Sequence, residues 1–327
     1  MEGGRGPGNG RERPLVTIAI PTYNRAATYL PVALESALAQ RYAPLEVLVS
    51  DNCSTDGTEA FMRRRSDERL RYVRHARALT PNENFNFCLA QARGAYFQLL
   101  HDDDAIDPDF VAACLERVGY RTDVGVIRTG VRVIDAFGHP LGAVRNDAAG
   151  LSTADFFLAW FEGRTALYLA NTLYHTEYLR NLGGFRSRHN LFQDGLATVR
   201  LAARHGRADV PEVLASFRVH AGELTRAARV REWCEDSLEV LEAMCREAGE
   251  RETEIRERGR RFFATVNYRR AAQLRPLGAR LSQLAFVFRF FGGRCPPPAR
   301  LLLQSTALYR GLRNLKRRAL GRPQWAA

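Results

Sequence analysis

The chain alternates short apolar runs with segments of helical spacing, and this alternation constrains the fold more than any other feature. Residues 15–20 (LVTIAI), 45–50 (LEVLVS) and 95–100 (AYFQLL) are apolar runs of the kind that form buried strands. Segments 28–40 and 84–93, which lie between these runs, look helical. Strands that alternate with helices predict an α/β fold, in which helices flank a mostly parallel sheet.

Each of these three apolar runs is followed by polar side chains. Thr22, Asn24 and Arg25 follow the first run, Asp51-Asn52 follows the second, and Asp102–Asp104 follows the third. In parallel sheets, ligands bind beyond the carboxyl ends of the strands. Three separate segments are therefore expected to deliver polar groups to one edge of the sheet, which predicts a single binding site there.

The run Asp102-Asp103-Asp104 places three carboxylates in a row, and their mutual repulsion calls for a compensating charge. Mg²⁺ or Mn²⁺ provides it, because such ions take one or two carboxylates together with phosphate oxygens. The alternative is a solvated acidic helix start before Pro108, where acidic residues are favoured by the helix dipole. The segment 49–58 (VSDNCSTDGT) has a similar alternative, a turn that caps the next helix.

The remaining elements are expected at further ranges along the chain. The predicted helices are 57–65, a segment after Pro108, 152–162, 193–205, 230–249, 251–274, 278–291 and 299–319. The other predicted strands are 70–74, 124–134, 166–174 and 210–219. A turn is expected at Gly183-Gly184-Phe185. No run of about 18 uncharged apolar residues occurs, so no membrane-spanning helix is expected.

Charge divides the chain into a body and a basic tail. Residues 251–327 hold 18 basic and 3 acidic side chains, whereas the remainder holds 30 basic and 33 acidic ones. The net charge of +12 therefore belongs to the C-terminal part. We expect a disordered leader at 1–13, an α/β domain at 14–225 and a helical, basic extension at 226–327.

Three segments, VTIAIPTYNR, VLVSDNCSTDGT and NENFNFCLAQARGAYFQLLHDDDAIDP, together resemble the inverting glycosyltransferases of family 2. The resemblance covers roughly residues 14–220. It implies a Rossmann-like GT-A fold, with a donor half at about 14–108 and an acceptor half at about 109–225. It also implies transfer of one sugar from a nucleotide-sugar, a UDP- or dTDP-sugar, to an acceptor hydroxyl with inversion, assisted by Mn²⁺ or Mg²⁺.

The resemblance assigns roles to residues of the donor half. Thr22 and Tyr23 are implied to line the nucleobase pocket, and Asp51 to accept a hydrogen bond from the base. A loop carrying Asn82, Asn84 and Asn86 is implied to lie next to the donor. The donor-binding residues expected in this way are Pro21, Thr22, Tyr23, Asn24, Arg25, Asp51, Asn52, Asn82, Asn84, Asp102 and Asp103.

The resemblance also implies a metal site. Asp104 and Asp102 are expected near the metal and the diphosphate, and Asp103 near the ribose. His220, in FRVHAGELTR, matches a position after the last strand from which the family approaches the metal. The expected metal ligands are therefore Asp104, Asp102 and His220, although a histidine such as His220 can equally serve as a local hydrogen-bonding residue.

Asp194 is the candidate general base that the resemblance implies. Members of the family carry an acidic pair at a helix start after a Gly-Gly-Phe turn, and here Gln193-Asp194 follows that turn. Inverting transfer needs one carboxylate to take the proton of the acceptor hydroxyl. The alternative is that Asp194 only caps the helix that follows it.

Two departures from the family pattern keep other functions open. His101 stands where an acid is usual, and Gln193 replaces a glutamate. A non-catalytic scaffold that keeps the fold therefore remains an alternative. A nucleotidyltransferase is disfavoured, because PTYNR supplies no glycine for a phosphate loop. The Gln-x-x-Arg-Trp sequence of processive polymerases is absent, which favours transfer of a single sugar.

The basic tail combines apolar faces with arginines at 278–291 and 299–319. Such segments can bind an anionic membrane surface, or they can pack on the catalytic domain or in a homodimer. Nucleic acid is not expected as a partner, because no nucleic-acid module is visible. The acceptor is expected to be a glycan, a lipid-linked molecule or a small molecule. The expected location is the cytoplasm, with peripheral attachment to the inner face of the membrane left open.

Overall fold

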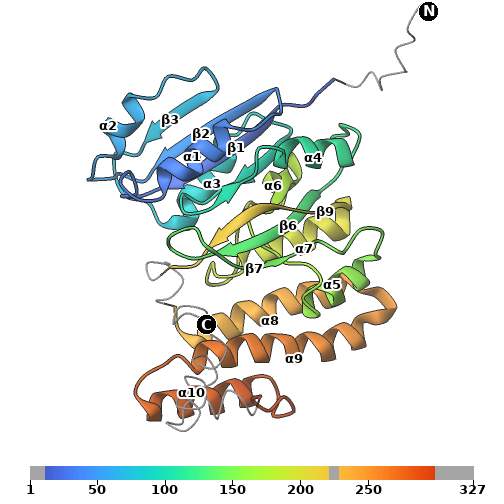
Figure 1. Ribbon diagram of the computed structural model, residues 1–327. Helices are drawn as coiled ribbons and strands as arrows, with labels where there is room; N and C mark the ends of the chain where they lie inside the picture. The colour runs from blue at the N-terminus through green and yellow to red at the C-terminus, as the bar shows by residue number, and fades with distance from the viewer. Residues whose placement is uncertain (1–11, 221–227, 299–327) are drawn as a thin grey trace, which may run out of the picture. The chain divides into compact units, whose positions relative to one another are not determined.

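The computed structural model describes residues 12–220 and 228–298, and these residues divide into two units (Figure 1). The first unit comprises Met1–Arg186 and Gln193–Ala221, and the second comprises Ser187–Phe192 and Gly222–Ala327. The second unit therefore includes a short loop from the middle of the chain. Residues 1–11 of the expected leader and the expected segment 299–319 lie outside the described residues.

The first unit is built on a nine-stranded sheet with the order β3-β2-β1-β4-β8-β6-β9-β5, and β7 pairs with β6. The strands are β1 (Val16–Thr22), β2 (Leu45–Asp51), β3 (Leu70–Arg74), β4 (Tyr96–Leu99), β5 (Ala105–Ile106), β6 (Val126–Ile134), β7 (Pro140–Val144), β8 (Thr172–His175) and β9 (Arg207–Arg218). The helices of this unit are α1 (Leu30–Leu38), α2 (Thr58–Arg63), α3 (Pro81–Gln91), α4 (Phe110–Arg117), α5 (Thr153–Phe161), α6 (Thr176–Asn181) and α7 (Gln193–His205). The α/β fold predicted from the sequence is confirmed.

The parallel part of the sheet is its first half. β1 pairs in parallel with β2 on one side and with β4 on the other, and β2 pairs in parallel with β3. Every residue of β1 and β2 is buried, because helices such as α1 and α3 cover the sheet. This burial on both faces explains why these strands read as continuous apolar runs instead of alternating patterns.

The second half of the sheet mixes directions. β8 is antiparallel to both β4 and β6, β6 forms a hairpin with β7, and β6 is parallel to β9. The extended segment expected at 166–174 is a strand only from Thr172 onward. The Asn171 side chain accounts for the difference: it accepts from Tyr168 N and donates to Thr129 O, which holds the chain in a turn before β8 begins.

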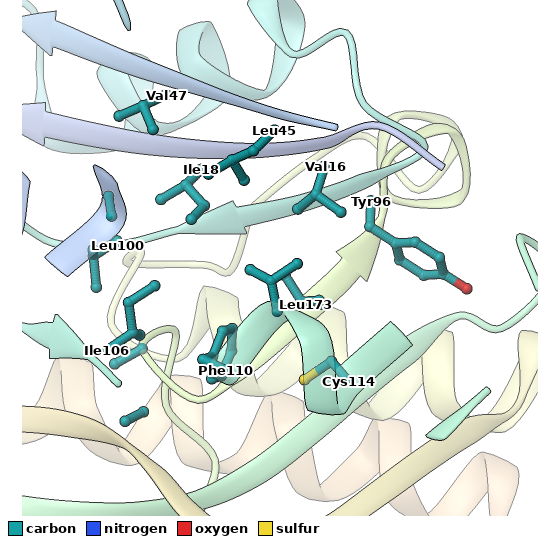
Figure 2. Packing of buried hydrophobic residues seen from close by; sticks show 14 of the residues in the cluster. Val16, Ile18, Leu45, Val47, Tyr96, Leu100, Ile106, Phe110, Cys114 and Leu173 are labelled. Atoms are coloured by element: carbon teal, nitrogen blue, oxygen red, sulfur yellow. The ribbon is translucent and has the colours of Figure 1, made fainter. Parts of the chain in front are cut away.

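One apolar cluster fills the space between this sheet and its helices (Figure 2). Ile18 from β1, Val47 from β2 and Leu173 from β8 are fully buried in it, together with Phe110 from α4. Burial of each such side chain stabilises the fold by about 1.5–3 kcal/mol. The cluster therefore holds the carboxyl ends of β1, β2 and β4 in fixed positions.

The second unit consists of three α-helices and a 3₁₀ turn in its described part. α8 (Val230–Glu247), the turn Gly249–Arg251, α9 (Glu252–Ala271) and α10 (Leu277–Phe290) follow one another, which agrees with the helical ranges expected from the sequence. Among the helices of the described residues, none combines the length and the apolar character that a bilayer-spanning helix needs.

The contacts between α8 and α9 are apolar and aromatic, with one buried polar link. The guanidinium of Arg270 lies 3.6 Å from the ring centroid of Trp233, a cation–π contact. Phe263 is fully buried, and Asn267 Nδ2 donates to Ser237 Oγ at 2.9 Å. These contacts give the unit a core of its own.

Candidate active site

The ends of β1 and β4 are joined by a hydrogen bond at the expected edge of the sheet. Thr22 Oγ1 donates to Asp102 Oδ2 at 2.7 Å, and Tyr23 N approaches the same oxygen at 3.4 Å. Burial and the neighbouring charge of Asp103 raise the pKa of Asp102 to about 7. Two of the expected donor-binding segments therefore meet, and Asp102 is the residue that links them.

The turn after β1 is also tied to the turn after β2. Asn24 has a φ of 54° and accepts through Oδ1 from Thr55 N at 2.8 Å, while its backbone N donates to Ser54 Oγ. Asn52 exchanges two hydrogen bonds with the backbone of Leu79. Both asparagines therefore shape the loops at this edge, and Tyr23 beside Asn24 is 51% exposed.

Asp51 is less accessible than its expected role requires. Its side chain is fully buried, Oδ1 accepts from Ser54 N at 2.8 Å, and Oδ2 accepts from the hydroxyl of Tyr72 at 2.6 Å. Burial and this hydrogen bond raise the pKa of Tyr72. Both carboxylate oxygens of Asp51 therefore have partners within the protein.

The asparagines of α3, which are expected beside the donor, have hydrogen-bond partners within the protein. Asn84 is 3% exposed, and its amide contacts the side chain and the carbonyl of Ser50. Asn82 and Asn86 both donate to the carbonyl of Phe185, and Asn86 Oδ1 accepts from Phe185 N at 2.8 Å. Asn84 therefore joins α3 to β2, and the other two hold the Gly-Gly-Phe turn.

The acid run itself contains a pair that links β4 to the segment after β9. Asp103 Oδ2 lies 2.8 Å from His220 Nε2, with the two side chains 20% and 5% exposed. Asp104 is 2% exposed, and its Oδ1 accepts from Arg218 N at 2.9 Å. Burial and the charge of Asp103 raise the pKa of Asp104 well above its usual range.

His101, Asp103 and Asp104 each offer a ligand atom, and these atoms lie within 4.8 Å of one another. Burial lowers the pKa of His101, which keeps its imidazole neutral and able to coordinate. Its Nε2 is buried and has no hydrogen-bond partner among the described residues. An orphaned imidazole nitrogen beside two carboxylates fits a divalent cation. Asp102, expected among the ligands, is not a member of this group and faces Thr22 instead.

Two residues that sequence reasoning missed surround this cluster. The ring of Tyr29 lies 4.9 Å from the His220 ring, and the guanidinium of Arg218 lies 4.9 Å from the Tyr29 centroid. Arg218 Nε also donates to the carbonyl of Asp103 at 2.7 Å. The guanidinium of Arg25 lies 5.6 Å from the centroid of the same Tyr29 ring. The only sequence signal for these two residues was that Arg218 lies two positions before His220.

Asp194 lies in the first turn of α7 and is partly buried. Burial raises the pKa of its carboxyl to about 6. The neighbouring Gln193 has a buried Oε1 with no hydrogen-bond partner in the described part of the chain. Burial, together with the charge of Asp194, also raises the pKa of Tyr174. The carboxyl of Asp194 can therefore take up a proton near neutral pH.

Known proteins resemble the chain both in sequence and in fold. Residues 17–181 match the family described as glycosyl transferase family 2. The succinoglycan biosynthesis protein ExoO of Rhizobium meliloti is 38% identical over 104 residues, which are 32% of this chain and 30% of ExoO. The chain thus matches less than a third of that relative's length.

Two solved structures share the fold. TarS of S. aureus in complex with UDP-GlcNAc superposes with a TM-score of 0.61 at 16% identity, over 88% of this chain and 82% of TarS. The mannosyltransferase PcManGT from Pyrobaculum calidifontis, in complex with GDP-Man and Mn²⁺, gives 0.55 at 20% identity, over 92% and 83%. At such identities the likeness concerns the fold alone. The match of residues 17–181 covers half of the chain, including the turn after β1 and the acid run, and on this ground the chain belongs to glycosyl transferase family 2.

Proposed function

We propose that this chain is a glycosyltransferase that moves one sugar from a nucleotide-sugar to an acceptor hydroxyl with inversion, assisted by a divalent metal and without processivity. The observation that carries the proposal is the pair Asp103–His220, which lies beside His101 and Asp104 at the ends of strands that belong to a family 2 fold. TarS bound to UDP-GlcNAc and PcManGT bound to GDP-Man support a nucleotide-sugar as the donor, for which we favour a UDP- or dTDP-sugar.

Asp103 and His220 are the proposed metal ligands, with His101 as a third candidate. Asp104, which the sequence favoured, is not the first choice, because its carboxylate already accepts from Arg218 N. Imidazole ligands fit Mn²⁺ better than Mg²⁺, which prefers oxygen ligands. The metal, when bound, would neutralise charge that develops on the leaving nucleotide diphosphate.

The arginines around Tyr29 are proposed to bind the donor's diphosphate. Arg25 and Arg218 both place guanidinium groups over the Tyr29 ring, close to the acid run. A guanidinium presents a planar set of donors that suits phosphate oxygens. The exposed ring of Tyr23, on the turn after β1, is available to stack on the nucleobase.

Asp194 is the proposed general base. A base works best when its pKa lies near the working pH, and burial brings the pKa of Asp194 to about 6. The ionised carboxylate would take the proton of the acceptor hydroxyl as that oxygen attacks the anomeric carbon. The sugar–phosphate bond breaks on the opposite face, so the transfer inverts the configuration at that carbon.

The partner of the second unit is proposed to be an anionic membrane surface. On α10, Leu277 and Leu281 are 55% and 53% exposed, and Ala285 continues the same stripe one turn further. Leu284 and Val287 on another face of the helix are buried. No acidic residue follows Glu257 in the sequence, and α10 itself carries Arg280 and Arg289, whose charge complements anionic lipid.

Vesicle sedimentation tests this partner. The full chain is expected to bind vesicles that contain phosphatidylglycerol and not vesicles of phosphatidylcholine alone. Changing both Leu277 and Leu281 to Ser should reduce binding, because apolar insertion is lost. The matched control is Val32→Ser, which removes an exposed apolar side chain from α1. Equal sedimentation of the double variant and the wild type, or a shift from dimer to monomer in the variant instead, would contradict the membrane assignment.

The activity is tested by incubating the protein with Mn²⁺ and a panel of UDP-, dTDP- and GDP-sugars while nucleotide release is followed. Release from at least one donor is expected. Asp194→Asn should lower turnover by about 10²- to 10⁴-fold, the range that general-base catalysis contributes, and leave donor binding intact. Donor binding without release by the wild type, across a panel of acceptors, would favour the non-catalytic scaffold instead.

A further inference from the structure

The loop Ser187–Phe192 belongs to the second unit, although it lies within the acceptor half of the sequence. It directly precedes Gln193 and Asp194, the start of α7. A residue spans at most about 3.6 Å of chain, so Asp194 lies within about 7 Å of Phe192 along the backbone. The conformation of this loop therefore limits where the carboxylate of Asp194 can lie.

One buried carboxylate of α8 holds the loop. Asp236 is fully buried. Its Oδ2 accepts from Ser187 Oγ at 2.6 Å, from Leu191 N at 2.9 Å and from Phe192 N at 3.3 Å. Its Oδ1 accepts from His189 N at 2.8 Å. Four donors from the loop thus converge on a single side chain.

The loop requires a carboxylate at position 236 because it presents only hydrogen-bond donors to that side chain. An ionised carboxylate offers about four acceptor sites and no donor, which matches the donors that the loop presents. A buried charge is costly unless hydrogen bonds compensate for it, and bonds to a charged acceptor are about twice as strong as neutral ones. The loop conformation and the charge of Asp236 therefore stabilise each other.

Neighbouring residues of α8 contact the same loop. Glu239 Oε2 accepts from Arg188 N at 2.8 Å, and Glu235 Oε2 lies 2.7 Å from His189 Nε2. The loop also closes on itself, because Asn190 has a φ of 56° and accepts from Ser187 N. An acidic face of α8 and a left-handed turn thus fix the loop over its whole length.

We propose that Asp236 is a positioning residue for catalysis: by holding residues 187–192 it fixes the start of α7 and thereby the carboxylate of Asp194. The effect of Asp236 then passes along the chain, from the loop to the start of α7. This inference rests on the proposed role of Asp194 as the general base. A misplacement of a reacting group by about 1 Å can lower a rate by about 100-fold, so loss of the loop's anchor should be visible in turnover.

The test compares the full-length variant Asp236→Asn with the wild type. The amide retains one acceptor oxygen but places an NH₂ group against the loop's N–H donors. We expect kcat to fall by about 10- to 100-fold while the KM of the donor stays unchanged, since the donor residues lie on other segments. Glu242→Gln is the matched control: it removes an acid of the same helix that pairs with Arg256 on α9. An unchanged kcat in folded Asp236→Asn would overturn the inference.

A double-mutant cycle shows whether Asp236 acts through Asp194. In an Asp194→Asn background, Asp236→Asn should lower the residual kcat by much less than in the wild type, because the positioned group is already lost. Equal fold-losses in both backgrounds would contradict a positioning role. Full turnover by Asp194→Asn alone would instead refute the proposed base, and this outcome is distinct from the first two.

Ser187→Ala provides a milder variant if Asp236→Asn does not fold. It removes one of the four donors and leaves the three backbone bonds in place. A several-fold loss in kcat with unchanged donor KM and an unchanged melting temperature supports the inference. Wild-type kcat in this variant, together with the loss of folding in Asp236→Asn, would assign Asp236 to stability alone and overturn the inference.

Discussion

Nε2 of His220 lies 2.8 Å from Oδ2 of Asp103, and this contact joins the segment after β9 to the end of β4. Both side chains are largely shielded, at 5% and 20% exposure. Asp103 also belongs to a group with His101 and Asp104, whose ligand atoms lie within 4.8 Å of one another, and the Nε2 of His101 has no hydrogen-bond partner among the described residues. We propose that the metal binds here, at the ends of the strands that carry the acid run.

The pH dependence of turnover should follow Asp194. Because the pKa of its carboxyl is about 6, kcat/KM is expected to rise as the pH increases through 6 and to level off above 7. The base must be ionised to accept a proton, so the acidic limb reports this residue. Initial rates between pH 5 and 8 at saturating Mn²⁺ measure it. A fall of kcat/KM centred near pH 4 would contradict the assignment, because a buried Asp194 should titrate near pH 6.

Because its carboxyl is buried, ionised Asp194 should lower the free energy of unfolding. The pKa of the folded protein, about 6, exceeds the usual 3.8, so the folded state binds a proton more tightly than the unfolded state. As the pH rises from about 4 to 6, the free energy of unfolding of the wild type therefore decreases progressively. Above pH 6 the whole of this destabilisation is present. Asp194→Asn should raise the free energy of unfolding at pH 7.5 by up to about 3 kcal/mol.

Urea unfolding of both proteins at pH 7.5 and pH 5 checks this prediction. The advantage of Asp194→Asn is expected to shrink at the lower pH, where the wild-type carboxyl is protonated in the folded state. A variant that is less stable than the wild type at pH 7.5 would show that the carboxylate stabilises α7 as a cap instead.

A buried ion cluster on β6 and β9 should be essential for folding. Asp209 Oδ2 lies 2.9 Å from Arg207 Nε, and Oδ1 lies 3.7 Å from Arg128 Nη1. Burial lowers the pKa of Arg128 to about 10, and both guanidinium groups lie over the Phe156 ring. Asp209→Asn leaves two buried cations without a counter-charge, which should cost about 3–5 kcal/mol.

The control for Asp209→Asn is Asp123→Asn, which removes the partner of Arg121 in a surface pair whose side chains are 50% and 60% exposed. Exposed pairs of this kind contribute about 0–1 kcal/mol. Thermal or urea unfolding of the two variants should therefore differ clearly. Similar losses in both would mean that the buried cluster is compensated in another way.

The Gly-Gly-Phe turn offers a test with its own internal control. Gly184 has a φ of +78°, and an added Cβ would lie 2.1 Å from Oδ1 of Asn86, the atom that accepts from Phe185 N. Gly183 has a φ of +91° but no atom within 4 Å of such a Cβ. Gly184→Ala should therefore destabilise the protein by more than the roughly 1 kcal/mol of backbone strain that we expect for Gly183→Ala. Equal losses of stability in the two variants would show that a clash with Asn86 adds nothing to the effect of Gly184→Ala.

The first half of the fold was predictable because its strands are buried on both faces. β1 and β2 read as apolar runs, and the polar residues after them, such as Asn24 and Asn52, were expected at one edge because parallel strands end there together. The short β8 was less predictable, because the turn before it depends on the Asn171 side chain and its distant partner Thr129.

The meeting of the polar segments at one edge of the sheet was predictable, and the partners of their individual side chains were less so. Asp51 and Asn84 are polar residues near the ends of their elements, as expected for donor binding. The hydroxyl of Tyr72 donates to Asp51 and that of Ser50 donates to Asn84, and such partners are set by tertiary packing. Tyr29 could not be predicted as a neighbour of the acid run, because its ring contact with His220 arises from tertiary packing. Asp236 lies more than forty residues from the loop it holds, and no local pattern connects the two.

The measurement that tests the central claim most directly is calorimetric titration of UDP into the protein with and without Mn²⁺. The account predicts that Mn²⁺ strengthens UDP binding to the wild type. It further predicts that Asp103→Asn abolishes this gain, whereas Asp109→Asn, at a surface pair with Arg41, keeps it. Full retention of the Mn²⁺-dependent gain by Asp103→Asn would contradict the metal site and the mechanism built on it.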